Sequence, residues 1–281
     1  MEPWQHRMAR VNNVRLHYVI QGSGPPAILL HGWPQSWYQW RLILPALAEH
    51  YTVIAPDLRG YGLSDKPPGG YDKRTMAADI HELIRSLGYH RIRLIGHDRG
   101  ARVSHRYGLD YPDEVEKLVV MDIVPTRIVF ERVTAEIARG YWHWFFHLVP
   151  DLPELLVGAN VEAYLRHFFT TWTYNRAAFT PEVIAEYVRS YSAPGALRGG
   201  FNDYRAGMFE DWPQDTRDAG RKLQMPTLVL WGAESLARVF NVLEIWQEVA
   251  QDVRGEAIPE CGHFLPEEQP QVVAQKLLEF L

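Results

Sequence analysis

The pattern of apolar and polar positions changes twice along the chain, and each change predicts a different kind of structure. Up to about residue 122, short apolar runs such as 26–30 and 115–121 alternate with stretches of helical spacing. Continuous apolar runs of this length are typical of strands that are buried on both faces. The spacing within 75–89 predicts a helix that ends at Gly88. Strands that alternate with helices predict a mostly parallel sheet with helices on both faces.

Between residues 123 and 215 the pattern is helical and aromatic, and no strand-like apolar run interrupts it. The alternation of strands and helices then returns and continues to the terminal helix expected within 269–281. We therefore predict an α/β fold whose core is built from two segments, 1–122 and 216–281, around an inserted helical cap at 123–215.

Composition narrows the class of protein. The chain has 281 residues, of which 47% are hydrophobic, so it is long enough to bury a sizeable core. The net charge is −5, with both signs spread along the chain, which argues against a nucleic-acid surface and weakly against an anionic membrane. A buried pocket can still carry its own local charge and bind a small anion.

Several absences shape the remaining expectations. The first residues carry no apolar targeting segment or cleavage signature, and no apolar run is long enough to span a bilayer, so we expect a soluble cytoplasmic protein. Cys261 is the single cysteine, which excludes an intramolecular disulfide. The chain has no H-E-x-x-H, CxxC or phosphate-loop motif, and we expect neither a metal nor an organic cofactor.

The stretch RLIGHDRGARVSHR, residues 93–106, carries the most specific signal. Its frame resembles the G-x-S-x-G turn in which a strand bends sharply into a helix and exposes a nucleophile, but Asp98 stands where the serine would be. Gly96 and Gly100 flank it, as the close backbone approach at such a turn requires. We predict Asp98 as a nucleophile; the structural alternative is an aspartate that caps the following helix.

A nucleophile of this kind needs a base and an acid. His263 lies in a Gly-flanked loop after the last predicted strand, which is where the general base would stand. Asp122 directly follows the apolar run 115–121, and a buried carboxylate there needs a partner such as a histidine N–H. We favour Asp122 as the orienting acid over Glu234, which follows the strand predicted within 225–232.

The nucleophile limits the reaction. A carboxylate that attacks carbon leaves an ester, which water can cleave, whereas a serine at an alkyl halide would leave an inert ether. Epoxides and carbon–halogen bonds therefore both suit Asp98. Arg99 and Arg102 are spaced i, i+3 at the start of one helix and share a face beside it. Guanidinium forks bind carboxylates, so we expect both to hold a substrate carboxylate, unless they pair with Asp98 or Asp122 or point to solvent.

Six stretches together resemble the α/β-hydrolase superfamily and, within it, the fluoroacetate (haloacetate) dehalogenases: HGWPQSW, PDLRGYGLSDKP, GHDRGARVSHRYGLDYP, MDIVPT, YWHWFF and CGHFLPEEQP. The resemblance implies hydrolysis of a haloacetate to glycolate and halide, by a homodimer. It implies that Arg99 and Arg102 bind the substrate carboxylate and that His143, Trp144 and Tyr204 bind the departing halide.

The same resemblance implies that the backbone N–H groups of Trp33 and Arg99 form the oxyanion hole. An epoxide hydrolase is the nearest alternative, because it shares the Asp nucleophile and the His base. It would need cap tyrosines to protonate the epoxide oxygen; the candidates are Tyr204, Tyr141, Tyr164, Tyr174, Tyr187 and Tyr191. It would have no evident use for the two arginines. A non-catalytic ligand-binding member of the fold is a third alternative, although it need not retain a nucleophile, a base and an acid together.

Overall fold

A single mixed sheet organises the molecule. The computed structural model describes residues 4–281, so residues 1–3 of the first predicted core segment lie outside the described residues. The sheet has the order β1-β2-β4-β3-β5-β6-β7-β8, in which β1, β2 and β4 pair antiparallel and the remaining pairs are parallel. Its strands are β1 (Gln5–Val11), β2 (Val14–Gln21), β3 (Pro26–Leu30), β4 (Thr52–Pro56), β5 (Ile92–His97), β6 (Val115–Met121), β7 (Thr227–Gly232) and β8 (Val253–Ile258).

The apolar runs lie in the middle of this sheet because both of its faces are buried. Along β5, Leu94 packs into one core cluster with residues of α2 (Lys73–Ser86), α3 (Asp98–Asp110) and α12 (Val242–Val249). The next residue, Ile95, packs into the other cluster with residues of α1 (Leu44–Ala48) and α14 (Pro270–Phe280). Both side chains have no exposed surface. Burial on both faces explains why these strands read as continuous apolar runs.

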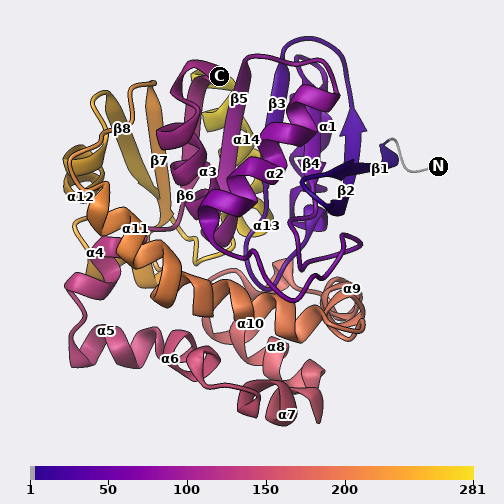
Figure 1. Ribbon diagram of the computed structural model, residues 1–281, viewed down its shortest axis with the longest axis vertical. Helices are drawn as coiled ribbons and strands as arrows, with labels where there is room; N and C mark the ends of the chain where they lie inside the picture. The colour runs from indigo at the N-terminus through magenta and orange to yellow at the C-terminus, as the bar shows by residue number, and fades with distance from the viewer. Residues whose placement is uncertain (1–3) are drawn as a thin grey trace.

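The core helices cover the sheet on both sides; Figure 1 shows α2 and α3 in front of it and α14 behind it. The core helices are α1 (Leu44–Ala48), α2 (Lys73–Ser86), α3 (Asp98–Asp110), α12 (Val242–Val249), α13 (Leu265–Glu268) and α14 (Pro270–Phe280). The short helical turns are η1 (Trp37–Trp40), η2 (Pro112–Glu114), η3 (Arg176–Ala178), η4 (Gly207–Asp211, π-helical) and η5 (Leu236–Val239).

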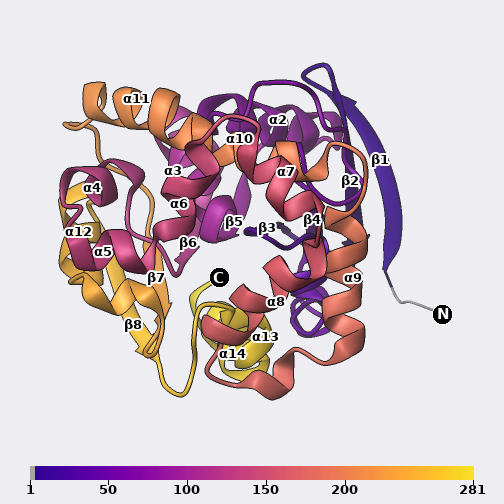
Figure 2. The ribbon, with the colours of Figure 1, turned by 90° about the horizontal axis from the view of Figure 1, so that it is seen from below.

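Between β6 and β7 the chain forms a run of helices that lies below the sheet in Figure 1 and in front of the strands in Figure 2. They are α4 (Thr126–Glu131), α5 (Ala135–Gly140), α6 (Trp142–Leu148), α7 (Leu152–Gly158), α8 (Val161–Thr171), α9 (Pro181–Tyr191), α10 (Ala196–Ala206) and α11 (Trp212–Arg217). The predicted fold class is confirmed. None of the helices described between residues 4 and 281 has the length and apolar character needed to cross a bilayer.

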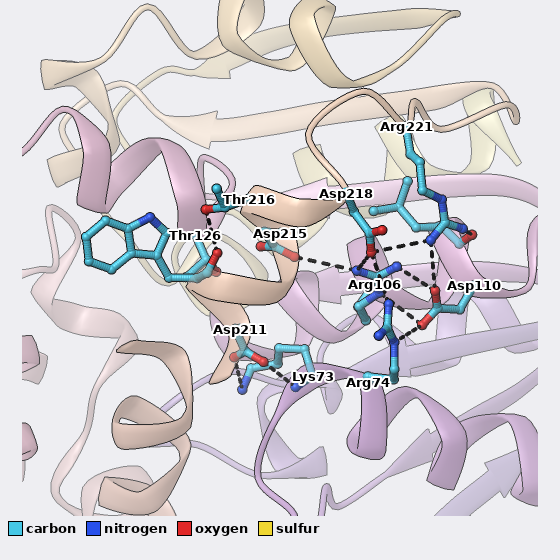
Figure 3. Close-up of polar contacts among 12 residues, drawn as sticks. Lys73, Arg74, Arg106, Asp110, Thr126, Asp211, Asp215, Thr216, Asp218 and Arg221 are labelled. Carbon is cyan, nitrogen blue, oxygen red and sulfur yellow. Dashed lines mark hydrogen bonds and ion pairs between the residues drawn. The ribbon is translucent and has the colours of Figure 1, made fainter. Parts of the chain in front are cut away.

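An ion network joins the end of this helical segment to the core (Figure 3). Arg106 on α3 contacts Asp218 at 2.8 Å and Asp215 at 3.7 Å, and Arg74 on α2 contacts the same Asp218 at 3.0 Å. Asp110 on α3 accepts from both arginines. The chain is therefore anchored to α2 and α3 where it returns from the helical segment to β7.

Candidate active site

The predicted nucleophile turn lies at the carboxyl end of β5. Asp98 has a φ of 46°, in the left-handed region that non-glycine residues rarely adopt outside strained turns. A Cβ at Gly100 would lie 2.3 Å from the carbonyl oxygen of Leu30, and one at Gly96 would lie 2.6 Å from the Cα of Ala101. The two glycines are thus needed for β3, β5 and α3 to approach closely enough to hold the turn.

The carboxylate of Asp98 is buried but charged. One of its oxygens, Oδ2, accepts a hydrogen bond of 2.9 Å from the backbone N–H of Trp33, one of the two predicted oxyanion donors. Burial alone would raise the pKa of Asp98, but the neighbouring His263 and the charges of Arg99 and Arg102 outweigh it, and the pKa lies below its ordinary value. Asp98 is therefore ionised at neutral pH, as a nucleophile must be.

His263 lies beside this carboxylate and is oriented by Asp122. Its Nδ1 bonds Oδ2 of Asp122 at 2.6 Å, and the other oxygen of Asp122 accepts from the backbone N–H of Gly232 at 2.9 Å. The Nε2 of His263 is buried and has no hydrogen-bond partner among residues 4–281. Burial would lower the pKa of His263, but the hydrogen bond and charge of Asp122 raise it above its ordinary value. Glu234 is exposed and pairs with Arg238 instead.

Arg102 is a buried cation at the site that forms no ion pair with a carboxylate among residues 4–281. It is 4% exposed, and its Nη1 donates to the carbonyl of Val124 at 3.1 Å and to the hydroxyl of Thr126 at 2.9 Å. Within residues 4–281 no carboxylate forms an ion pair with it, and its Nε has no hydrogen-bond partner. Burial, reinforced by the charge of Arg99, lowers the pKa of Arg102 to about 10. A buried cation without a counter-ion is a ready site for a small anion.

Arg99 differs from the expectation that both guanidinium groups stand open to a substrate. Its Nε donates to the carboxylate of Asp203 at 2.8 Å, and its Nη2 donates to the backbone carbonyl of the same residue at 2.8 Å and to its carboxylate. The partner is neither Asp98 nor Asp122 but a residue of α10 in the helical segment. Only Nη1 of Arg99 is buried without a partner, so one nitrogen remains for a ligand.

A cavity of about 20 Å³ lies where the nucleophile, the base and Arg102 meet. It is lined by Asp98, Arg102, Asp122, Tyr141, His143, Trp144, Trp172, Leu236 and His263. This volume holds about one water molecule, so any organic substrate, a two-carbon one included, requires the walls to move. A cleft of about 260 Å³ shares Tyr141, Trp172 and Leu236 with the cavity and lies outside it.

Two of the three predicted halide ligands line this cavity. His143 is fully buried, and its pKa lies well below its ordinary value because of that burial and of the nearby His147, so it is a neutral imidazole. Trp144 stacks against the guanidinium of Arg102, whose central carbon lies 4.7 Å from the ring centroid. Tyr204 does not line the cavity; its ring packs on His143, with centroids 5.6 Å apart, and on Arg99.

These groups are arranged for a two-step reaction, in which a nucleophile forms an ester and water then hydrolyses it. An ionised carboxylate stands on a strained turn, a histidine with a free nitrogen stands beside it, and a backbone N–H already points at the carboxylate. The model of the alpha/beta hydrolase fold matches residues 25–270. The chain belongs to the α/β-hydrolase family.

Two relatives of this hydrolase differ in activity. This chain is 46% identical over 279 residues to a soluble epoxide hydrolase of Corynebacterium sp. (strain C12), and the match covers 98% of this chain and 96% of the relative. It is 41% identical over 288 residues to a fluoroacetate dehalogenase of Burkholderia sp, covering 100% of this chain and 94% of the relative. The solved structure of the epoxide hydrolase CorEH matches 99% of this chain and 98% of that chain, with a TM-score of 0.94 and 45% identity. The likeness establishes a hydrolase with a resemblance to dehalogenases, and the substrate depends on the residues of the site.

Sequence reasoning missed the residue that holds Arg99 in this hydrolase. Asp203 has no exposed surface and binds the core three times over, through Arg99, through Nζ of Lys73 at 2.6 Å and through the hydroxyl of Tyr61 at 2.7 Å. Those charges, above all Arg99 and Lys73, outweigh its burial and hold its pKa below the ordinary value. The available signal was its position in NDYRAG, directly before Tyr204.

Proposed function

We propose that this hydrolase removes the halogen from haloacetates, converting fluoroacetate to glycolate and fluoride through an ester on Asp98. The observation that carries the proposal is Arg102, a buried guanidinium that has no counter-ion within residues 4–281 and lines the same small cavity as Asp98. A haloacetate has its carboxylate one bond from the carbon under attack, so one anion contact fixes the reacting carbon. The cavity is small, so a two-carbon substrate would require less movement of its walls than a bulky one.

In the first step the substrate carboxylate binds Arg102 and the free Nη1 of Arg99. An oxygen of Asp98 attacks the halogen-bearing carbon, a carbon–oxygen bond forms, and the carbon–halogen bond breaks with its electron pair leaving on the halide. His143, Trp144 and Tyr204 donate hydrogen bonds to the departing halide. Such donors matter most for fluoride, which leaves carbon poorly unless its charge is met.

In the second step His263, oriented by Asp122, takes a proton from water, and the hydroxide attacks the carbonyl carbon of the Asp98 ester. Backbone N–H groups of Trp33 and Arg99 stabilise the oxyanion. The intermediate collapses, the glycolate oxygen takes the proton from His263, and Asp98 returns as a carboxylic acid that releases its proton. One oxygen of Asp98 then comes from water, and the net products are glycolate, halide and a proton.

The helical segment 123–215 would act as a cap that excludes water from the first step. The resemblance further supports a cytoplasmic homodimer; light scattering behind a sizing column tests the dimer, which a single monomeric mass would contradict.

Epoxide hydrolysis is the second candidate, and one observation favours it. Asp203 already neutralises Arg99, which leaves the neutral His143 and the nearby Tyr204 as donors for an opening epoxide oxygen. The identity to the Corynebacterium epoxide hydrolase supports the same alternative.

A measurement of halide release distinguishes haloacetate dehalogenation from epoxide hydrolysis. Purified protein would be incubated with fluoroacetate, chloroacetate and styrene oxide, with fluoride read by electrode, chloride by ion chromatography and diol by liquid chromatography. Asp98→Asn is the blank. Fluoride or chloride above that blank supports the proposal, whereas diol without halide contradicts it in favour of the epoxide hydrolase.

A further inference from the structure

Glu268 is a buried carboxylate whose charge is met by backbone N–H groups instead of by a cation. It is 3% exposed, ends α13 and forms no ion pair within residues 4–281. Its oxygens accept four backbone hydrogen bonds, from Gly262 at 2.9 Å, Phe264 at 3.0 Å, Tyr174 at 2.8 Å and Asn175 at 3.0 Å. Hydrogen bonds to an ionised acceptor are the stronger kind, so this set fixes the backbone that it touches.

Two of those donors stand on either side of the candidate base. Gly262 and Phe264 flank His263 in the chain, so one carboxylate holds the peptide groups before and after it. The N–H of His263 donates to the carbonyl of Trp172 at 2.8 Å, and the ring of Trp172 lies 5.1 Å from the imidazole. The loop that carries the base is therefore held from the helical segment as well as from α13.

The other two donors belong to that helical segment. Tyr174 and Asn175 follow α8, and their N–H groups converge on the same oxygen, Oε2, that binds Gly262. A Cβ at Gly262 would lie 2.2 Å from the carbonyl of Trp172, which shows how closely the two segments meet. Glu268 thus joins residues 172–175 to the base loop at one buried point.

We propose that Glu268 is a positioning residue that holds His263 for ester hydrolysis and is not needed for the attack by Asp98. The inference rests on the covalent ester of the proposed function, and it applies to a haloacetate and to an epoxide alike. Asp98 stands on the β5 turn, which Glu268 does not touch. The base loop meets that turn through Nε2 of His97 and the carbonyl of His263, 2.7 Å apart, so we expect ester formation to change far less than ester hydrolysis. Ester hydrolysis needs Nε2 of His263 aimed at a water, and a shift of about 1 Å in such a group costs on the order of 100-fold in rate.

Glu268→Gln tests this with little change in shape. The amide has one acceptor oxygen. Placed where Oε2 stands, it keeps the hydrogen bonds from Gly262, Tyr174 and Asn175, but it turns an NH₂ donor toward the N–H of Phe264 and removes the negative charge. Glu267→Gln is the matched control, because Glu267 is equally buried and also binds the helical segment, through Tyr187 at 3.0 Å, but does not touch the base loop. Burial raises the pKa of Glu267 to about 7 in spite of its ion pair with Arg41, so Glu267→Gln controls for the loss of a buried carboxylate that also has a charged partner.

Reactions would be quenched at successive times and measured by intact-protein mass spectrometry. The time courses give the rates at which the ester forms and decays in both variants and in wild type. For Glu268→Gln we expect formation within about twofold of wild type and decay slowed by roughly 10- to 100-fold, with ester accumulating in the steady state. For Glu267→Gln we expect no ester to accumulate. Normal decay in Glu268→Gln, or an equal loss of formation and decay, overturns the inference.

A second readout needs no substrate and so separates this inference from the proposed function. The Nδ1 proton of His263, held between the ring and Asp122, should give a low-field NMR resonance that His263→Asn removes. We expect it to broaden or disappear in Glu268→Gln and to persist in Glu267→Gln. Its persistence in both overturns the inference, whether or not any ester forms. If Glu268→Gln does not fold, Glu268→Asp, which keeps the charge but reaches fewer donors, takes its place in both measurements with the same expectation.

Discussion

The carboxylate of Asp203 on α10 holds the guanidinium of Arg99 on α3 through Nε at 2.8 Å, although 104 residues separate them in the chain. The same carboxylate binds Nζ of Lys73 on α2 at 2.6 Å. One buried anion thus pairs with two buried cations and ties the helical segment to the core; Lys73 also lies 3.3 Å from Asp211. The arrangement leaves Arg102, on the next turn of α3, as the cation without a balancing carboxylate in the described chain.

Replacing this anion should destabilise the protein strongly. Asp203→Asn leaves Arg99 buried without its counter-ion and leaves Lys73 with Asp211 alone, and breaking a buried pair in this way costs about 3–5 kcal/mol. We expect the free energy of unfolding, measured in urea, to fall by that amount, and haloacetate turnover to fall because Arg99 loses its orientation.

The control for that change is Asp151→Asn. Asp151 also pairs with an arginine, Arg198, at 2.7 Å, but its side chain is 78% exposed. Exposed ion pairs contribute little, so we expect no measurable change in stability. Equal effects of the two substitutions would show that the burial of Asp203 is not what makes its pairing matter.

The fold could be predicted from the sequence because its signals are local. Apolar runs and helical spacing are properties of neighbouring residues, and they give the class and order of elements directly. The sequence also allowed a prediction of Asp98, Asp122 and His263. Each follows a strand of one parallel sheet, and the carboxyl ends of such strands meet at one edge. The geometry joins His263 to Asp122 and leaves Glu234 at the surface.

The partners of those residues could not be predicted, because they depend on how separate segments pack. Asp203 meets Arg99 only when α10 lies over α3, and no local pattern encodes that contact. Glu268 sits in a stretch, PEEQP, that looks like an ordinary acidic helix start. The i, i+3 spacing predicts that Arg99 and Arg102 share a face, but it does not encode that Arg99 pairs with Asp203 while Arg102 forms no ion pair within residues 4–281.

Arg102 should lower the free energy of unfolding while it binds the substrate carboxylate. The fall of its pKa from 12.5 to about 10, caused by burial and by the charge of Arg99, corresponds to a net cost of roughly 3 kcal/mol for the charged form. We expect Arg102→Met to raise the free energy of unfolding by about 1 kcal/mol and to lower kcat/KM for chloroacetate at least 100-fold.

Styrene oxide is the internal control for that variant, because a neutral epoxide has no carboxylate for Arg102 to bind. Any diol formation by the wild type should therefore survive in Arg102→Met. Arg102→Lys keeps the positive charge but loses the forked guanidinium. Its kcat/KM for chloroacetate should therefore lie between those of wild type and Arg102→Met. Unchanged haloacetate kinetics in Arg102→Met would remove the basis of the proposed function.

His263 should control only the second half of the reaction. We expect His263→Asn to slow turnover about 1,000-fold and to accumulate an ester on Asp98, seen by mass as an added carboxymethyl group. Asp98→Asn is the control and should show no added mass. Full turnover in His263→Asn would mean that another group activates the water.

The pH dependence of that half reaction should carry a signature of the ester. The charge of Asp98 is one of the causes that raise the pKa of His263, and ester formation replaces it with the charge of the substrate carboxylate, which is paired with Arg102. The histidine must be neutral to act as a base, so ester hydrolysis should rise with pH through the pKa of the ring. We expect the midpoint of that rise, from single-turnover decay, to lie at lower pH than the NMR titration of His263 in the free protein. A midpoint at higher pH would contradict this account.

Asp215 lies at the join between α11 and the core and gives the protein a pH-dependent stability (Figure 3). Its side chain is 14% exposed and lies 3.7 Å from Nη1 of Arg106. Burial and the neighbouring Asp211 raise the pKa of Asp215 to about 7 in spite of Arg106. An unfolded chain would titrate the same group near its ordinary value of 3.8.

Between these two pH values the folded protein keeps a proton that the unfolded chain has lost, so stability falls as pH rises toward 7. Above pH 7 both forms are ionised and the loss stays constant. We therefore expect Asp215→Asn, which cannot ionise, to be more stable than wild type by roughly 1–3 kcal/mol at pH 8, and the difference to vanish near pH 4. Urea unfolding at both pH values measures it, with the low-pH pair as the control for the substitution itself. A difference that is the same at pH 4 and pH 8 would mean that the contacts of the amide, and not the charge of Asp215, set the stability.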